Sequence, residues 1–408
     1  MKIGLLHFAA PPVVGGVESV LAHQAGMIAD AGHQVCVIAA QGQVWRDDIE
    51  LFLIPLVGSR HPQILEVKAD LDRGHIPPLF ETTVNAIVLQ LQVITHGLDI
   101  IIAHNVCSLN KNLALTAALY RLNNSPAFPR LILWHHDLAW TTDRYRSELH
   151  EGFPWDLLRT DWPAVTQVVV SSFRQAELAD LMRIPLSRVH VIPNGVEIAS
   201  FLKLEPQTVS WIKELGLLKT APLLLLPVRI TPRKNLEMAL HILAQLRTYF
   251  PLACMLVTGP LGAHNPANQA YFSGLLKIRL ELDLLGSAYF LAEFGDDYLP
   301  DAIIADFYRL ADAVLLPSKE EGFGIPLIEA ALSHRPVFCT DLVPLQALGL
   351  TDAQYFSVDD DPLTVATRIF QYLDSDPVYR IAVRTRQQYT WERIYQEKIA
   401  PLFMNNSD

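Results

Sequence analysis

Short apolar runs alternate with longer segments of helical hydrophobic period along most of this 408-residue chain. The short runs are bounded by Pro, Gly or polar residues, which is typical of strands buried on both faces of a parallel sheet. The longer segments repeat apolar residues about every three to four positions, as amphipathic helices do. The pattern therefore predicts an α/β protein with parallel sheets.

Two successive sets of strands and helices follow from this pattern. In the first half it predicts strands at 2–8, 34–39, 100–103, 130–134, 167–171 and 189–192, and helices at 16–31, 79–95 and 109–122. In the second half it predicts strands at 222–228, 254–258, 289–291, 313–316 and 336–340, and helices at 235–248, 269–284, 301–310 and 325–333. Two sets of similar size, in a chain too long for one ordinary core, predict two Rossmann-like doubly wound domains.

A polar, Pro-containing stretch at 197–219 separates the two sets. We therefore expect an N-terminal domain over residues 1–197 and a C-terminal domain over residues 198–380. Residues 381–408 are expected to form a C-terminal helix, within a mostly helical part predicted at 362–375 and 377–402. Trp391 and Ile394 share one face of that last helix.

Composition narrows the class of partner. The net charge of −11 argues against nucleic acid, which needs a basic surface, and weakens the case for docking on an anionic membrane. We expect no signal peptide and no membrane span, because the apolar stretches are too short, and hence a cytoplasmic protein. None of the cysteines pair at metal-ligand spacing, which predicts free buried thiols in a reducing compartment: Cys36, Cys107, Cys254 and Cys339.

The most informative stretch follows the apolar run that ends at Leu316. A glycine-bearing loop leads into an apolar-periodic helix with Pro326 in its first turn, a favoured position for proline. Gly324 permits a tight turn, and the helix start aims free amides at an anion. Glu321 and Glu329 flank the turn and can accept hydrogen bonds from hydroxyls. The combination suits a nucleotide sugar, and the alternative is a strand–loop–helix unit with surface glutamates.

Residues 321–330, Glu-Gly-Phe-Gly-Ile-Pro-Leu-Ile-Glu-Ala, resemble the acidic motif of retaining glycosyltransferases of family 4, whose usual form is close to E-G-F-G-L-P-L-L-E-A. Further motifs in the same order extend the resemblance over nearly the whole chain. It implies a GT-B fold, with the active site between two Rossmann-like domains and a C-terminal helix that crosses back to the N-terminal domain. The C-terminal domain would bind the nucleotide sugar and the N-terminal domain the acceptor. The resemblance also implies retention of the α-configuration without a metal or other cofactor.

The same resemblance assigns roles within this stretch. Glu321 would contact hydroxyls of the donor sugar, and Glu329 would bind the ribose hydroxyls. The backbone between them would hold the sugar and phosphate, through Phe323, Gly324, Ile325, Pro326 and Leu327.

Arg229 and Lys234 lie five residues apart, at a strand end that enters a helix, where ligands bind in open α/β sheets. Two fixed cations can stabilise the negative charge of a departing diphosphate without a metal. The stretch resembles the family's G-R-L-x-x-x-K-G, whose Arg and Lys bind the donor diphosphate. Asn235 stands where the family has Gly, which puts the path of the loop in question. A solvated basic turn is the alternative.

Three glycines are further candidates. Gly15 and Gly16 open the first helix in a Gly-Gly-Val-Glu string that resembles the start of the family. The resemblance implies a loop over the donor diphosphate that also shapes the acceptor pocket, although a structural turn explains two glycines equally well. Gly259 resembles the family's strand end V-G-x-G and is a candidate donor-side contact.

His136, followed by Asp137, ends a strand and resembles the family histidine that contacts donor sugar or acceptor. His135 is the second candidate for that role, and His104 is expected on the same rim. The adjacent Arg144 and Tyr145 add a cation for an acidic acceptor and a face for a sugar ring. Structural histidines and an ordinary loop are the alternatives, and a His-His metal site lacks a third ligand.

Two acidic strings invite a metal-binding reading, Asp296-Asp297 and Asp359-Asp360-Asp361. The second precedes Pro362 and a predicted helix, where Asp is an ordinary N-cap. We therefore expect no metal at either.

With these features, the resemblance implies a retaining transferase that moves a hexosyl group from a UDP- or GDP-linked sugar to a glycan or small polar acceptor. Two alternatives stay open, a phosphorolytic enzyme on the same scaffold and a non-catalytic subunit that binds a sugar nucleotide. The intact set of Arg229, Lys234, Glu321 and Glu329 argues against the latter. The motifs leave the base, the sugar, the acceptor and the oligomeric state open.

Overall fold

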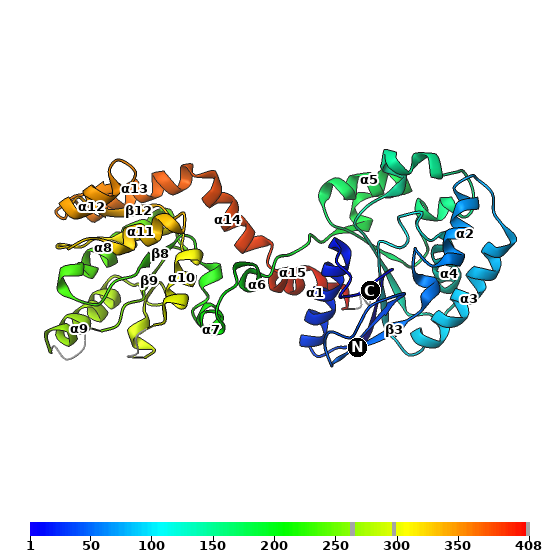
Figure 1. Cartoon of the computed structure of the whole chain (residues 1–408), viewed down its shortest axis with the longest axis horizontal. Helices are drawn as coiled ribbons and strands as arrows, with labels where there is room; N and C mark the ends of the chain where they lie inside the picture. Colours follow the sequence, from blue (N-terminus) through cyan, green and yellow to red (C-terminus); the bar gives the residue numbers. More distant parts are fainter. Residues whose placement is uncertain (262–265, 296–298, 405–408) are drawn as a thin grey trace. The chain divides into compact units, whose positions relative to one another are not determined.

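The computed structural model describes residues 1–261, 266–295 and 299–404, which form two compact units (Figure 1). The first unit comprises Met1–Gly195 and the segment from Trp391 onward. The second unit comprises Val196–Thr390. Each unit is built on its own sheet, in which every strand pairing is parallel.

The sheet of the first unit has seven strands in the order β3-β2-β1-β4-β5-β6-β7. The strands are β1 (Lys2–Leu6), β2 (Gln34–Ala39), β3 (Ile49–Leu53), β4 (Ile100–His104), β5 (Arg130–His135), β6 (Thr166–Val169) and β7 (Val189–Val191). The α-helices are α1 (Gly16–Asp30), α2 (Pro62–Leu71), α3 (Pro78–Thr95), α4 (Leu113–Asn123), α5 (Ser172–Met182) and α15 (Trp391–Ile394).

Helices cover both faces of this first sheet. Successive strand residues point to opposite sides, so each strand contributes side chains to two cores. Leu6 and Ile101 pack with α2, α3 and α4 on one face. Leu5 and Ile102 pack on the other face with α1 and the C-terminal segment. This arrangement explains why the strands read as continuous apolar runs.

The sheet of the second unit has six strands in the order β10-β9-β8-β11-β12-β13. The strands are β8 (Leu223–Leu226), β9 (Cys254–Val257), β10 (Ala288–Phe290), β11 (Ala313–Leu316), β12 (Val337–Thr340) and β13 (Gln354–Phe356). The α-helices are α6 (Ile198–Leu202), α7 (Pro206–Leu215), α8 (Leu236–Tyr249), α9 (Pro266–Glu281), α10 (Asp301–Leu310), α11 (Ile325–Leu332), α12 (Val343–Gly349), α13 (Pro362–Ser375) and α14 (Pro377–Gln388). The predicted fold class, two Rossmann-like doubly wound domains, is confirmed.

The sequence pattern missed two strands, and both lie at a sheet edge. In β3 only Ile49 is buried, and in β13 only Phe356. An edge strand has one neighbour and more solvent, so it needs fewer apolar residues and leaves a weaker signal.

The stretch at 197–219, predicted as a polar separator, instead contains α6 and α7 of the second unit. Its polar residues serve packing: Thr208 is fully buried, and its hydroxyl donates to Asp306 at 2.6 Å. The first crossing between the units falls just before this stretch, between Gly195 and Val196.

The helix predicted at 377–402 is interrupted where the chain returns to the first unit. Its first part, α14, ends at Gln388 within the second unit. There Val196 N–H donates to the Tyr389 carbonyl at 2.8 Å, so the two crossings run side by side. Trp391 and Ile394 are then buried together in the core of the first unit, as their shared helix face predicted.

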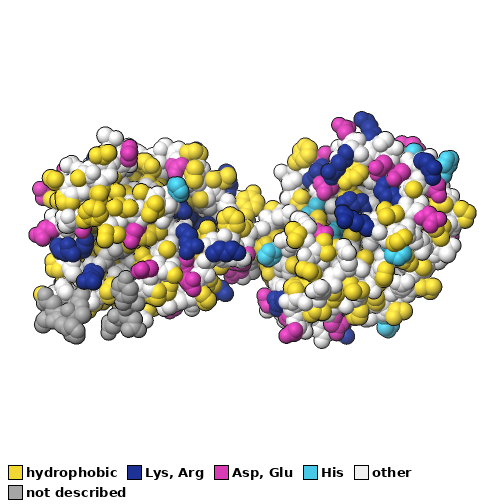
Figure 2. Space-filling view, in the orientation of Figure 1, with side chains coloured by type: hydrophobic (Ala, Val, Ile, Leu, Met, Phe, Trp, Pro, Cys, Tyr) yellow, Lys and Arg dark blue, Asp and Glu magenta, His cyan; other side chains and the backbone are white. Residues whose placement is uncertain are grey.

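Basic and acidic side chains are interspersed on the visible face of both units (Figure 2). All the cysteines are free and buried, as expected: Cys36, Cys107, Cys254 and Cys339. No helix in the described part of the chain combines the length and apolar character that a membrane crossing requires.

Candidate functional site

Each sheet reverses its strand order at one point, between β1 and β4 in the first unit and between β8 and β11 in the second. The loops beyond the carboxyl ends of strands at such a point are where doubly wound proteins bind ligands. Most of the candidate residues lie in these loops or in the loop after the neighbouring strand. The candidate residues of the two units differ in their chemistry.

In the second unit, the loops after β8 and β11 are joined by an ion pair between Lys234 and Glu321. The Lys234 Nζ lies 2.5 Å from Glu321 Oε2, and their side chains are only 8% and 15% exposed. A backbone hydrogen bond of 2.8 Å from Lys319 N–H to the Arg233 carbonyl ties the same two loops together. A largely buried cation is thus held in one place, with its charge balanced by a partner.

Arg229 lies in the loop after β8 but differs from Lys234 in its surroundings. Its side chain is exposed and makes no hydrogen bond or ion pair within the described part of the chain. The guanidinium charge is therefore available to an anion from solution.

The conformation of Asn235 shows whether its replacement of the family's Gly changes the path of the loop. It precedes α8 with a φ of +53°, in the left-handed region that Gly adopts freely and Asn tolerates better than other residues. The loop thus takes a path that a glycine would also permit.

The loop after β11 turns into α11 at Gly324. This residue has a φ of +108°, and a Cβ on it would lie 2.5 Å from Leu345 Cδ2, so only glycine fits. After the turn, Leu327 packs in the core, whereas the side chains of Phe323 and Ile325 are 55% and 59% exposed. Of the candidate donor-binding residues here, Leu327 is therefore anchored by packing and the other two are open to solvent.

Glu329 is held by Tyr308, a residue that the sequence analysis did not single out. Tyr308 is 2% exposed, and its hydroxyl donates to Glu329 Oε2 at 2.7 Å. Burial and the neighbouring carboxylate raise the pKa of Tyr308 above its usual range. A buried tyrosine hydroxyl signals that a partner exists, but the sequence does not say which residue it is.

The candidate glycines differ in whether packing leaves room for a larger side chain. A Cβ on Gly259 would lie 2.1 Å from the Val228 carbonyl oxygen, so close approach of two loops requires this glycine. A Cβ on Gly16 would meet nothing, and one on Gly15 would meet only the side chain of Glu18. Packing thus explains Gly259 without a donor contact, whereas it gives no reason for Gly16.

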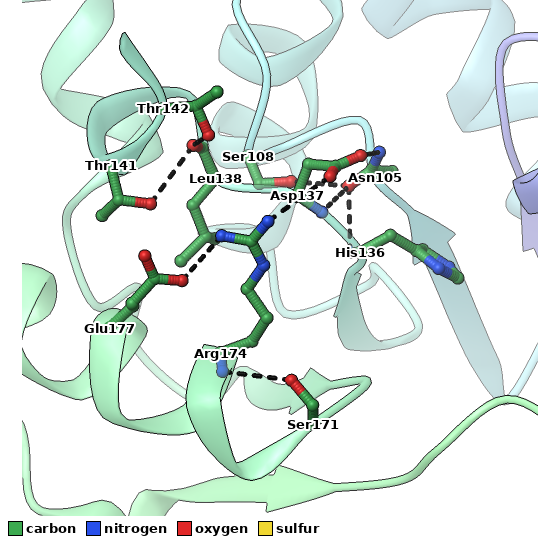
Figure 3. A network of polar contacts seen from close by, with 10 residues as sticks. All are labelled: Asn105, Ser108, His136, Asp137, Leu138, Thr141, Thr142, Ser171, Arg174 and Glu177. Atoms are coloured by element: carbon green, nitrogen blue, oxygen red, sulfur yellow. Dashed lines mark hydrogen bonds and ion pairs between the residues drawn. The ribbon is translucent and has the colours of Figure 1, made fainter.

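In the first unit, Asn105 holds the backbone of the His136 segment (Figure 3). Its Oδ1 accepts the N–H groups of His136 and Asp137, each at 3.0 Å. Asp137 also lies 3.6 Å from Arg174, which pairs with Glu177 at 2.6 Å. The sequence analysis did not single out Asn105, yet it positions the backbone of His136.

His104 and His135 are 0% and 1% exposed. His135 Nε2 donates to the Gln167 side-chain oxygen at 2.8 Å, deep within the sheet. His104 packs against Trp134 and His136, with ring centroids 5.4 and 5.8 Å away. This burial leaves neither side chain an open edge for an acceptor, so their placement does not support the direct contact that was expected.

These histidines are neutral at pH 7. Burial lowers the pKa of His135 to about 4, and burial together with the nearby His7 lowers the pKa of His136 to about 4. Burial also lowers the pKa of His104 well below its ordinary value. Neutral imidazoles exchange hydrogen bonds with hydroxyls without adding a charge.

A cavity of about 620 Å³ opens in the first unit. His7 and Glu18 line it, and so do the cations Arg60, Lys68 and Lys111. Neither Arg144 nor Tyr145 lines this cavity. Arg144 is exposed, and its guanidinium carbon lies 4.7 Å from the ring centroid of Tyr145. The position of Arg144 therefore does not support the acceptor role expected of it.

Nowhere in residues 1–261, 266–295 and 299–404 do three or more His, Cys, Asp or Glu side chains gather closely enough to hold a metal ion. Asp361 stands at the predicted N-cap position of α13, but its side chain accepts no capping hydrogen bond. The Asp296-Asp297 pair lies outside the described residues.

Two family models match the chain, one described as Glycosyltransferase Family 4 over residues 14–200 and one as Glycosyl transferases group 1 over residues 208–385. Mannosylglucosylglycerate synthase of Thermotoga maritima is 24% identical over 94% of both chains. D-inositol 3-phosphate glycosyltransferase of Kineococcus radiotolerans is 28% identical over 52% of this chain and 49% of its own. Several such matches span only about half of the relative's length, from 49% to 59%. The solved structure of sucrose-phosphate synthase from Thermosynechococcus elongatus aligns over 98% of each chain at 17% identity, with a TM-score of 0.38 that is too low to bear on activity.

Proposed function

The chain belongs to glycosyltransferase family 4, and we propose that it moves a hexosyl group from a UDP- or GDP-linked sugar to a glycan or small polar acceptor, with retention of the α-configuration. The observation that carries the proposal is the cation pair on the loop after β8, the fixed Lys234 and the unpaired Arg229. Two cations at a strand end suit a diphosphate better than any neutral ligand.

On the donor side, Arg229 and Lys234 bind the diphosphate and stabilise the charge it gains as it leaves. The ion pair to Glu321 sets the position of the Lys234 ammonium, and Glu321 keeps further acceptor capacity for sugar hydroxyls. Glu329, oriented by Tyr308, accepts hydrogen bonds from the ribose hydroxyls. The amides that begin α11 face the sugar and phosphate.

In the proposed step, the acceptor hydroxyl oxygen bonds to the anomeric carbon of the donor. The bond from that carbon to the diphosphate oxygen breaks, and its electron pair leaves with the diphosphate. The hydroxyl proton passes to the departing diphosphate, on the same face of the sugar. No metal takes part, because protein cations supply the charge, and a chelator is expected to leave the rate unchanged.

On the acceptor side, His136 is the proposed contact to the donor sugar or acceptor, with Asn105 holding its backbone. Burial of the imidazole keeps it uncharged at pH 7, because the pKa of His136 is about 4. It then serves as a hydrogen-bonding group that orients a hydroxyl and not as a cation. The names of two relatives, D-inositol 3-phosphate glycosyltransferase and mannosylglucosylglycerate synthase, agree with a small polyol acceptor.

Thermal-shift titration with UDP, GDP, ADP and their glucose and mannose conjugates tests the donor. A nucleotide that binds only the folded chain raises Tm according to its affinity and concentration. We expect one base to stand out, and the shift to be lost in Arg229→Ala. NMR of the product then checks that the new linkage is α.

Two results would redirect the proposal. Stabilisation by inorganic phosphate or a sugar phosphate, with none by any nucleotide, would identify a phosphorolytic enzyme. A nucleotide sugar that binds but is neither hydrolysed nor transferred to any acceptor would identify a non-catalytic binding subunit.

A further inference from the structure

The cavity of the first unit has a charge opposite to that of the chain. The protein carries a net charge of −11, yet the cavity is lined by Arg60, Lys68 and Lys111 against a single carboxylate, Glu18. Positive charge in a concave, partly enclosed site raises the local concentration of anions. This contrast makes the cavity suited to an anion.

The three cations are not equivalent. Lys68 is already neutralised, because its Nζ lies 2.6 Å from Asp72 and 2.8 Å from Glu148. Arg60 and Lys111 are exposed and make no side-chain hydrogen bond or ion pair with any described residue. Two unpaired cations on one cavity provide the charge that a bound anion needs.

His61, next to Arg60, adds an unused polar atom. Its Nδ1 is buried and has no hydrogen-bond partner among the described residues. A buried polar atom without a partner is costly in a folded protein, which favours a ligand or water at this position. The residue His61 lines the same cavity as the two unpaired cations.

The cavity also offers a site for hydroxyls. His7 Nδ1 lies 2.7 Å from the His104 carbonyl oxygen and donates to it, since a carbonyl only accepts. Its Nε2 lies 3.7 Å from Glu18, and this interaction holds the pKa of Glu18 below its usual value. Glu18 is therefore ionised at neutral pH and accepts hydrogen bonds from hydroxyls.

We propose that the acceptor is a small polyol that carries an anionic group, a phosphate or a carboxylate, and that Arg60 and Lys111 bind this group in the cavity. Its hydroxyls face Glu18 and His7. The volume of about 620 Å³ lies within the range of about 300 to 1,000 Å³ that is common for small-molecule sites. This inference rests on the proposed transferase function, since it names the acceptor of that reaction.

The test uses three matched probes with the full chain: glucose, glucose 6-phosphate and glucuronate. Binding is measured first by calorimetry without a donor, and then KM is measured with the nucleotide sugar found by thermal shift. We expect at least one of the two anions to bind about tenfold or more tightly than glucose, as a charge-assisted hydrogen bond predicts. Preference for glucose 6-phosphate identifies a phosphate, and preference for glucuronate a carboxylate.

Arg60→Gln and Lys111→Gln are each expected to weaken binding of the preferred anion about tenfold and to change glucose binding much less. Added salt is expected to weaken binding of the anion by the wild type. It should have little effect on binding by the double variant that combines Arg60→Gln and Lys111→Gln. Arg73→Gln is the matched control, because this exposed arginine of the same unit pairs with Asp70 at 2.6 Å and does not line the cavity. It is expected to leave all three affinities unchanged.

Equal affinity for glucose and both anions, or equal weakening of all three by the variants, would overturn the inference. Failure of the transferase proposal is a separate result, seen as the absence of nucleotide binding in the thermal-shift titration. The calorimetric comparison of the three probes needs no donor and decides the anion site in either case.

Discussion

The two units carry their candidate residues at the carboxyl ends of sheets with matching strand order, to which the first unit adds a seventh strand, yet the two sets of residues differ in how charge is handled. In the first unit, the strands end in histidines that burial keeps neutral, with a pKa of about 4 at His135 and His136. In the second unit, the loops after β8 and β11 bring a lysine and a glutamate together at 2.5 Å, and the loop after β8 also carries an unpaired arginine.

The comparison separates what the fold decides from what the side chains decide. Strand order fixes where a ligand lies, because loops diverge only where the order reverses. Side-chain type then sets what is bound: neutral imidazoles suit hydroxyls, and cations suit a diphosphate. Variants that act on one unit alone can therefore test the assignment.

The largest effect is expected from the cations of the second unit. Arg229→Ala and Lys234→Ala should each lower kcat about 10²- to 10³-fold, because the leaving diphosphate loses a fixed partner. Only Lys234→Ala should also lose stability, by about 3–5 kcal/mol, since it leaves Glu321 buried without its partner. Steady-state kinetics and urea unfolding measure the two effects.

A double variant separates activity from stability at this pair. Lys234→Met with Glu321→Gln removes both charges and should recover most of the stability, but none of the activity. Near-normal turnover in Arg229→Ala and Lys234→Ala would remove the basis for placing the diphosphate here.

The next largest effect is expected from the glycines. The variant in the second unit should lose stability, whereas the variant in the first unit should lose turnover. Gly259→Ala should cost about 3 kcal/mol of stability, because its Cβ would lie 2.1 Å from a backbone oxygen. Gly16→Ala should cost well under 1 kcal/mol, since nothing lies near its Cβ, but should impair turnover if a ligand approaches there. If both variants are equally stable, the packing explanation of Gly259 is wrong.

Acidification is expected to lower the folding stability of the first unit. A folded pKa of about 4, below the ordinary 6.5, means that the unfolded chain binds the proton more readily, so stability falls as the pH falls from 6.5 towards 4. At pH 5, His135 should account for a loss of about 2 kcal/mol relative to pH 7. His135→Gln should lose correspondingly less.

Tryptophan fluorescence in urea suits this measurement, because all the tryptophans except Trp211 lie in the first unit. An identical loss of stability on acidification in wild type and His135→Gln would contradict the prediction.

The smallest effect is expected at Asn235. Its φ of +53° should make Asn235→Ala less stable by about 1 kcal/mol, while Asn235→Gly should stay within a few tenths of a kcal/mol of wild type. Thermal unfolding of the two variants compares them directly. A stable alanine variant would show that the loop has another path.

The sequence predicted the sheets well because their central strands are buried on both faces and carry continuous apolar runs. Strand β2 has the predicted bounds of 34–39, and β11 those of 313–316. The edge strands β3 and β13 lack this signal. Residues 377–402 were predicted as one continuous helix because nothing in their helical period marks a break after Gln388. The break coincides with the hydrogen bond from Val196 N–H to the Tyr389 carbonyl.

The site could be predicted only as far as local motifs reach. Lys234 and Glu321 were both predicted, but not their ion pair, because 87 residues separate them in the chain. Tyr308 and Asn105 were missed as positioning residues, since their roles depend on partners that only the fold brings close. The cations of the cavity were missed for a related reason: Arg60 follows β3, and without that strand its loop did not appear to lie at the carboxyl edge of the sheet.

The side-by-side crossings at Val196 and Thr390 have a consequence for how the protein is made. The second unit is inserted within the first, whose core is closed by Trp391, Ile394 and Ile399. On the ribosome, domains generally fold in the order in which they emerge, the N-terminal one first. Here the first unit begins synthesis earliest, but the face of its sheet that α1 covers is completed only by the segment from Trp391 onward, after the second unit has emerged.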